Sequence, residues 1–179
     1  MARTNPYKKP PRKAKKTILF YGEGSAEEVF LKHLRKVYAR NSGVAVTIRN
    51  GQGGTADGIV EKASCYFGAF GKRIVLLDND KPKAEMERAR KIGKDYGVLL
   101  IENNPCLERL LLEILSYGKK LGNKKSQDLK KEFERKHICK KKRCDIEEYE
   151  KIFPKKVLDA KRKNVAELDR IIKIMEGGK

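Results

Sequence analysis

Apolar and polar residues alternate along the first hundred positions in a rhythm that predicts strands and helices in turn. Short apolar runs are typical of buried parallel strands, and apolar residues at every third or fourth position are typical of helices. The predicted strands cover residues 17–21, 44–48, 73–77 and 97–101, and the predicted helices cover about 26–40, 56–67 and 83–96. This alternation predicts an α/β fold with a mainly parallel four-stranded sheet flanked by helices.

The pattern changes after the fourth predicted strand. Leucine and isoleucine recur at helical spacing from Leu107 to Leu115, which predicts another helix. From residue 119 to the last residue no strand pattern is found, and a final helix is predicted near 165–175. The chain therefore divides into a flexible basic arm (1–16), an α/β core (17–118) and a basic, mainly helical C-terminal extension (119–179).

The charge of the chain favours one class of partner. The chain has 43 Lys and Arg against 24 Asp and Glu, a formal net charge of +19, which favours a polyanionic partner such as nucleic acid. Seven of the basic residues lie in 1–16, which has no acid, and twelve lie in 119–143 against three acids. A solvated charge run is the plain alternative. The candidate phosphate contacts are Arg12, Lys13, Lys15, Lys16, Lys140, Lys141, Lys142 and Arg143.

Other features bear on the compartment. No apolar run approaches the length of a membrane span, and no signal peptide is recognisable, so we expect a protein of the reducing cytoplasm with no membrane partner. The four cysteines are scattered and are expected to be free thiols. His137, Cys139 and Cys144 raise a zinc alternative, but their spacing is not a standard one and a fourth ligand is missing.

Acidic residues follow three of the four predicted strands. Glu23 follows the first, Asp78 and Asp80 the third, and Glu102 the fourth, with Glu108 a little further on. Because ligands of open α/β sheets bind beyond the carboxyl ends of the strands, we expect these acids to converge there. Clustered carboxylates repel each other unless a cation lies between them, and Mg²⁺ prefers oxygen ligands. Singly, each acid could instead cap a helix or form a turn.

The ordered set of motifs resembles a known family. The segments EGSAEEVFLKHL, GQGG, LLDNDKP and NNPCLERLLLEIL, within about residues 17–117, are similar to Toprim proteins of the RloB-like branch, which are associated with prokaryotic defence. The resemblance implies a Toprim-like fold, Mg²⁺ or Mn²⁺ as cofactor, and catalytic roles for Glu23, Asp78, Asp80 and Glu108, with the first three holding the metal. Ala26-Glu27 stands where relatives often have Thr-Glu, and Leu107 where an aromatic residue is common.

Two functions follow as hypotheses. The first is a Mg²⁺-dependent nuclease that hydrolyses the phosphodiester backbone of RNA or DNA, with RNA slightly favoured. The second is a non-catalytic module that binds nucleic acid or a protein partner on a Toprim scaffold. A partner ATPase is a further possibility that the sequence leaves open. The chain is too short for a topoisomerase, which needs further domains. Its glycine loop, residues 51–54, either approaches a phosphate or is an ordinary loop.

Overall fold

The computed structural model describes residues 16–115 and 121–178, and its centre is a four-stranded sheet in which all strands are parallel. The strand order is β2-β1-β3-β4. The strands are β1 (Lys16–Gly22), β2 (Val44–Asn50), β3 (Lys72–Asp78) and β4 (Val98–Asn103). The predicted α/β class and parallel sheet are therefore confirmed. Since the strands are parallel, all their carboxyl ends lie at one edge of the sheet.

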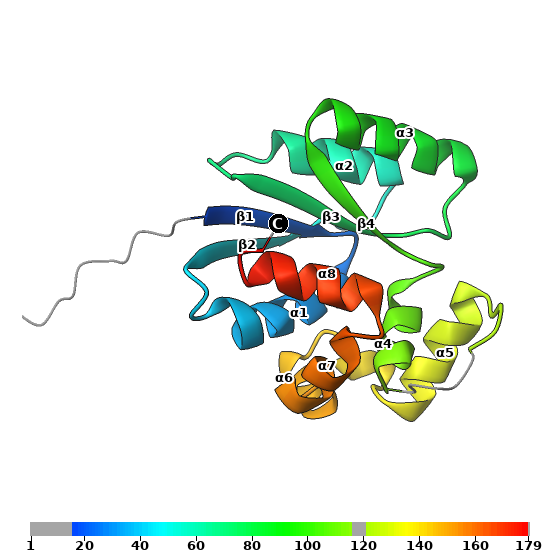
Figure 1. Ribbon diagram of the computed structural model, residues 1–179. Helices are drawn as coiled ribbons and strands as arrows, with labels where there is room; N and C mark the ends of the chain where they lie inside the picture. Colours follow the sequence, from blue (N-terminus) through cyan, green and yellow to red (C-terminus); the bar gives the residue numbers. More distant parts are fainter. Residues whose placement is uncertain (1–15, 116–120, 179) are drawn as a thin grey trace, which may run out of the picture.

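Helices cover both faces of the sheet (Figure 1). Helices α2 (Ala56–Cys65) and α3 (Lys83–Asp95) lie on one face, and α1 (Ser25–Leu34) and α8 (Ala166–Met175) lie on the other. Side chains of successive strand residues point to opposite faces. In β1, Leu19 packs with α2 and α3, whereas Phe20 belongs to the cluster on the α1 side.

The C-terminal extension is built of helices, as predicted, and it packs against the sheet. Its elements are α5 (Ser126–Lys136), a 3₁₀ turn (Lys140–Lys142), α6 (Ile146–Ile152), α7 (Lys155–Arg162) and α8, and α4 (Leu107–Leu115) precedes them. Buried Phe133, Tyr149 and Phe153 from this segment share one apolar cluster with Phe20 and Phe30. The extension thus completes the core on the α1 side.

Several boundaries differ from the predicted ones. Helix α1 begins at Ser25 with Gly24 as its N-cap, one residue before the predicted start at 26. The helix continues as a π-helical segment, Arg35–Ala39. Lys16, assigned to the flexible arm, is the first residue of β1, and its ammonium group donates to the Gly177 carbonyl. In the part of the chain that the structure describes, no helix is long and apolar enough to cross a membrane.

The shared core predicts that the extension stabilises the whole protein. Phe153 is fully buried with its ring centroid 5.9 Å from that of Phe30, and Phe67 is 97% exposed. Phe153→Ala should lower the free energy of unfolding by about 3–5 kcal/mol, because it leaves a cavity between the sheet and the extension. Phe67→Ala, the matched control, should change it by less than about 0.5 kcal/mol. Urea unfolding of both variants measures this, and equal midpoints would contradict it.

Candidate active site

The structure brings Glu23 and Asp78 together at the carboxyl edge of the sheet. Strands β1 and β3 are hydrogen-bonded neighbours, Asp78 is the last residue of β3, and Glu23 directly follows β1. The backbone N–H of Asp78 donates to Glu23 Oε2 over 3.3 Å. Two carboxylates separated by 55 positions in the sequence therefore lie side by side.

The carboxylate of Asp78 is almost completely buried, with a residue exposure of 5%. Its Oδ1 accepts a hydrogen bond from the Leu107 N–H at 2.8 Å and one from Asn103 Nδ2 at 3.4 Å. Its Oδ2 lies 3.6 Å from the ammonium group of Lys130. The end of β4, the start of α4 and helix α5 thus all contribute a group to this one side chain.

Two further acids lie behind this pair. Glu27, in the first turn of α1, is buried, and its Oε2 accepts from the Gly24 N–H at 2.9 Å. The helix approaches β1 so closely that a Cβ at Gly22 would lie 2.8 Å from the Cβ of Glu27. Glu108, in the first turn of α4, is 2% exposed; one of its oxygens pairs with Arg143. Within the described residues, its other oxygen, Oε2, has no hydrogen-bond partner.

Burial and mutual repulsion shift the protonation of these acids. Burial raises the pKa of Asp78 to about 7, and the negative charges of Glu27, Glu108 and Glu23 add to the increase, while Lys130 opposes it. Burial also raises the pKa of Glu27. The hydrogen bonds that Asp78 accepts favour its ionised form and limit the rise. These acids therefore carry negative charge that the surrounding protein groups neutralise only in part. A cation placed among them would be held by this charge.

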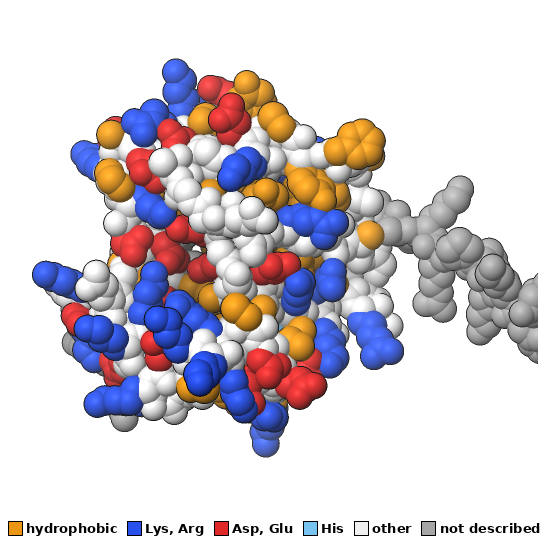
Figure 2. Space-filling model, turned by 180° about the vertical axis from the view of Figure 1, so that it is seen from behind, with side chains coloured by type: hydrophobic (Ala, Val, Ile, Leu, Met, Phe, Trp, Pro, Cys, Tyr) orange, Lys and Arg blue, Asp and Glu red, His pale blue; other side chains and the backbone are white. Residues whose placement is uncertain are grey.

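Basic side chains already lie against the acids. Lys81 Nζ is 2.8 Å from Glu23 Oε1, Lys130 faces Asp78, and Arg143 contacts Glu108 as well as Glu134, the latter at 3.3 Å. Of these side chains, Glu23, Asp78, Lys130 and Arg143 line a hollow of about 310 Å³. Figure 2 shows acidic side chains gathered in a recess with Lys and Arg side chains below it. The side chains that line the hollow include Glu23, Glu27, Asp78, Lys130, Arg143 and Cys144.

The donor set fits a hard divalent cation in part. Glu23 and Asp78 both line the hollow and carry carboxylate oxygens, the ligands that Mg²⁺ prefers. Among the residues that the structure describes, no group of three or more His, Cys, Asp or Glu is arranged to hold a metal ion. Mg²⁺ is usually bound by one or two carboxylates together with substrate phosphates. The arrangement fits that mode and does not provide a complete cage of protein ligands.

Two of the predicted acids lie elsewhere. Asp80 is exposed, and it does not line the hollow, because β3 ends at Asp78 and the chain turns. Glu102 was expected to follow the fourth strand, but β4 runs to Asn103 and Glu102 lies within it. Its carboxylate binds Arg90 of α3 with two hydrogen bonds, at 2.8 and 2.7 Å. The expected convergence of Glu102 on the site is therefore wrong, whereas Asp80 stays a predicted ligand, and its charge acts on Lys81 and Lys130.

Two backbone N–H groups of the glycine loop, residues 51–54, are already hydrogen-bonded within the fold. The N–H of Gly51 donates to the Gly22 carbonyl at 2.8 Å, and the N–H of Gly53 donates to the Glu23 carbonyl at 2.9 Å. These two groups are engaged by the end of β1 and are not directed at a phosphate. The loop instead fixes the backbone of Glu23, and Gly53 forms part of the wall of the hollow.

The basic candidates separate into four groups. Arg12, Lys13 and Lys15 lie outside the described residues, and Lys16 lies at the opposite edge of the sheet. Lys140, Lys141 and Lys142 form the exposed 3₁₀ turn, where Lys142 pairs with Glu148 at 3.0 Å. Arg143 alone of this set lines the hollow.

The zinc alternative finds no support in the geometry. The imidazole of His137 packs against Phe133, with ring centroids 5.6 Å apart, and Cys139 and Cys144 are exposed free thiols. As noted, the described residues contain no metal-ligating group of three. His33 is buried, and its Nε2 lies 2.7 Å from the Phe153 carbonyl, which is a structural role.

Four residues of the site have weak or no signals in the sequence. Glu27 resembles an ordinary first-turn acid, Lys81 follows two aspartates in a turn, and Lys130 stands in a basic stretch. Asn103 had a signal, because it ends a strand beside the one that ends in Asp78. Lys130 had none, since only the packing of α5 on α4 brings it to Asp78.

Comparisons with known proteins do not identify the chain: no family model, no curated protein and no solved structure matches it. The site is therefore interpreted from its own geometry.

The raised pKa of Asp78 predicts a pH-dependent stability. Its pKa is about 7 in the folded protein against 3.8 for a free side chain, so folding favours the protonated form. This contribution to stability is complete below about pH 4 and is lost as the pH rises through about 7. Asp78→Asn should therefore equal the parent near pH 4 and exceed its free energy of unfolding at pH 8 by up to about 4 kcal/mol, at 1.36 kcal/mol per pKa unit.

Glu102 provides a matched control, because its contribution to the free energy of unfolding changes with pH in the opposite direction. Arg90 lowers the pKa of Glu102, so its ionised form stabilises the fold above about pH 4.5, and Glu102→Gln should lose stability there. Urea unfolding between pH 4 and 8, without divalent cations, measures both variants. A constant difference between parent and Asp78→Asn across this range would contradict the assignment.

Proposed function

We propose that the protein is a Mg²⁺-dependent nuclease that hydrolyses phosphodiester bonds of a nucleic acid. The observation that carries the proposal is the pairing of Glu23 and Asp78 at adjacent parallel strand ends, in a hollow that also contains Lys130 and Arg143. Carboxylates that bind a metal and cations that bind phosphate are the two components that phosphodiester hydrolysis requires. A Toprim-type activity of the RloB-like kind, as the motifs imply, agrees with this site.

Each residue then has a role. Glu23 and Asp78 would hold the cation, which when bound polarises the scissile phosphate and supplies an activated water. Glu23 is the second ligand or the general base. Lys130 and Arg143 would exchange their carboxylate partners for phosphate oxygens as the substrate enters. Glu108 holds Arg143 at the hollow until the substrate enters, and the hydrogen bonds from Leu107 and Asn103 fix the orientation of Asp78. Asp80, which is exposed, would be a further ligand of the cation, as the family resemblance implies.

The net charge of +19 supports a nucleic-acid substrate, and the exposed turn Lys140–Lys142, next to Arg143, extends the basic surface from the hollow. RNA remains slightly favoured over DNA. A role in prokaryotic defence and a partner ATPase belong to the same proposal, since they come with the family resemblance.

The internal ion pairs favour a second candidate, a non-catalytic module that binds nucleic acid or a protein. Lys81, Lys130 and Arg143 already pair with Glu23, Asp78 and Glu108. Such pairs would hold the fold together without any metal. In the first candidate, replacing Asp78 strongly lowers cleavage but preserves binding of nucleic acid. In the second, the same replacement leaves binding nearly unchanged and there is no cleavage to lose.

A cleavage assay with Mg²⁺ or Mn²⁺ on single-stranded and duplex DNA and RNA tests the proposal. We expect Glu23→Gln and Asp78→Asn each to lower the cleavage rate by about 100-fold or more, within the range of general acid–base contributions. Both should keep the parent's affinity for nucleic acid within about threefold, since neither removes a phosphate-binding cation.

Glu102→Gln is the control, because it removes one carboxylate from the same sheet edge but not from the hollow; it should keep full activity. Chelation of the divalent cation should abolish cleavage. If no metal and no substrate class supports cleavage while binding persists, the second candidate is correct.

A further inference from the structure

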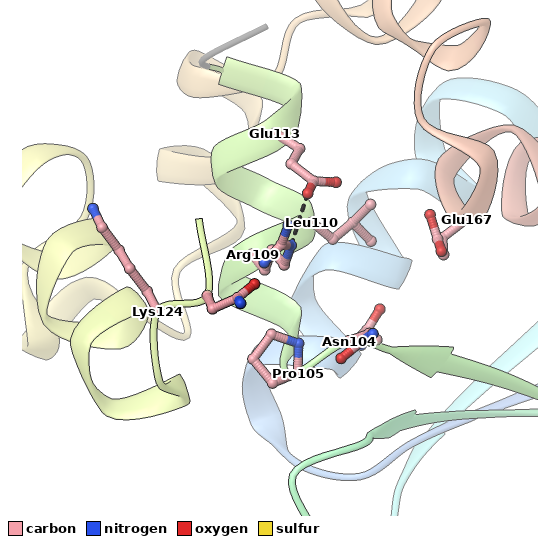
Figure 3. A pocket seen from close by; sticks show the side chains of 9 residues that line it. Asn104, Pro105, Arg109, Leu110, Glu113, Lys124 and Glu167 are labelled. Carbon is pink, nitrogen blue, oxygen red and sulfur yellow. Dashed lines mark hydrogen bonds and ion pairs between the residues drawn. The ribbon is translucent and has the colours of Figure 1, made fainter. Parts of the chain in front are cut away.

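A second cavity lies beside the candidate site, on the other side of the start of α4. It measures about 460 Å³, within the range of small-ligand pockets. Figure 3 shows Asn104 and Pro105 at its floor, Leu110 on α4, and Glu167 reaching in from the first turn of α8. Asn103 also lines it.

Some polar groups of this cavity are already paired. Arg109 binds Glu113 at 2.8 Å and the Gly122 carbonyl at 3.0 Å, and Lys124 binds Glu132 at 2.6 Å. These contacts stabilise the wall of the cavity and leave little of their charge for a ligand.

Other polar groups lack partners. Asn103 is only 1% exposed, yet within the described part of the chain its Oδ1 has no hydrogen-bond partner. A buried acceptor without a partner costs roughly 1–3 kcal/mol, so it requires an explanation. No salt bridge of Glu167 is present among the described residues, although its carboxylate faces the same space. The buried amide oxygen of Asn103 and the carboxylate of Glu167 are both acceptors, so a ligand that fits them carries several N–H donors.

Asn103 connects this cavity to the candidate site. Its Nδ2 donates to Asp78 Oδ1 at 3.4 Å, so one amide group forms the wall between the hollow and the cavity. A phosphate bound beside Asp78 would thus have its neighbouring nucleoside close to the cavity. Pro105 and Leu110 offer apolar surfaces for the faces of a base, and Asn104 and Asn123 offer further amides for its edge.

We infer that this cavity binds a guanine base next to the phosphate that the site acts on. Guanine presents two adjacent donors, N1–H and the 2-amino group, which a carboxylate accepts as a parallel pair, and Glu167 supplies that carboxylate. Adenine, cytosine and uracil do not present two such donors side by side. Hydrogen bonds to the Watson–Crick edges of unstacked bases are a common basis of sequence-specific recognition of single-stranded RNA. The inference rests on the proposed function, because it places the base by the phosphate.

Binding of GMP, IMP, AMP, CMP and UMP to the full chain, measured by isothermal titration calorimetry, tests the inference without any cleavage. GMP should bind at least tenfold more tightly than the other four. IMP is the sharpest comparison, because it lacks only the 2-amino group. Glu167→Gln should lower GMP affinity at least tenfold and remove the preference over IMP.

Glu147→Gln is the matched control, since Glu147 also lies in the first turn of a helix, α6, but outside the cavity. It should keep GMP binding unchanged. Equal affinities for GMP and IMP in the parent, or a guanine preference that survives Glu167→Gln, would overturn the inference. GMP selectivity retained in a protein that cleaves no substrate would refute the nuclease while leaving the guanine site intact, so the two failures are distinguishable.

Discussion

The burial of the Asp78 carboxylate is the constraint on which the carboxyl edge of this protein depends. A carboxylate at the end of a central strand, 5% exposed, loses most of its hydration and must be compensated by the protein. Compensation comes from the first N–H of α4, from the amide of Asn103 and from the ammonium of Lys130. Helices α4 and α5 are thereby both connected to the end of β3 through one side chain.

The compensation of the Asp78 charge is incomplete. The pKa of Asp78 remains raised, and one oxygen of Glu108 stays without a partner among the described residues. Structural ion pairs lower carboxyl pKa values, as the partly exposed Arg90 does for Glu102. Asp78 and Glu102, at the ends of adjacent strands, thus differ in the direction of their pKa shift, and a buried carboxyl with a raised pKa is a candidate for a functional site.

The C-terminal extension has two physical roles in this arrangement. Its apolar side chains, such as Phe153, cover the α1 side of the sheet, so the extension belongs to the core. Its cations, Lys130 and Arg143, reach the acids of the core and neutralise part of their repulsion. A phosphate that entered the hollow would compete with these carboxylates for Lys130 and Arg143. Its binding would therefore release the carboxylates from their ion pairs.

The fold class and part of the site could be predicted from the sequence, because both depend on local order. Strand and helix periodicity is a property of neighbouring residues, and parallel strands necessarily place their carboxyl ends at one edge. Glu23 and Asp78 were found in this way. Glu102 was misplaced because the exact strand ends set which face a side chain takes: β4 continues to Asn103, so Asn103 and not Glu102 faces Asp78.

The cations of the site and the second cavity were decided only by tertiary structure. Lys130 is one of twelve basic residues in a 25-residue stretch, and nothing in its neighbours distinguishes it. The packing of α5 on α4 brings it to Asp78, and the packing of α8 beside α4 brings Glu167 opposite Asn103. Asp78 and Lys130 are 52 positions apart in the sequence, and Asn103 and Glu167 are 64 positions apart. Their proximity depends on how whole helices pack, which no local pattern encodes.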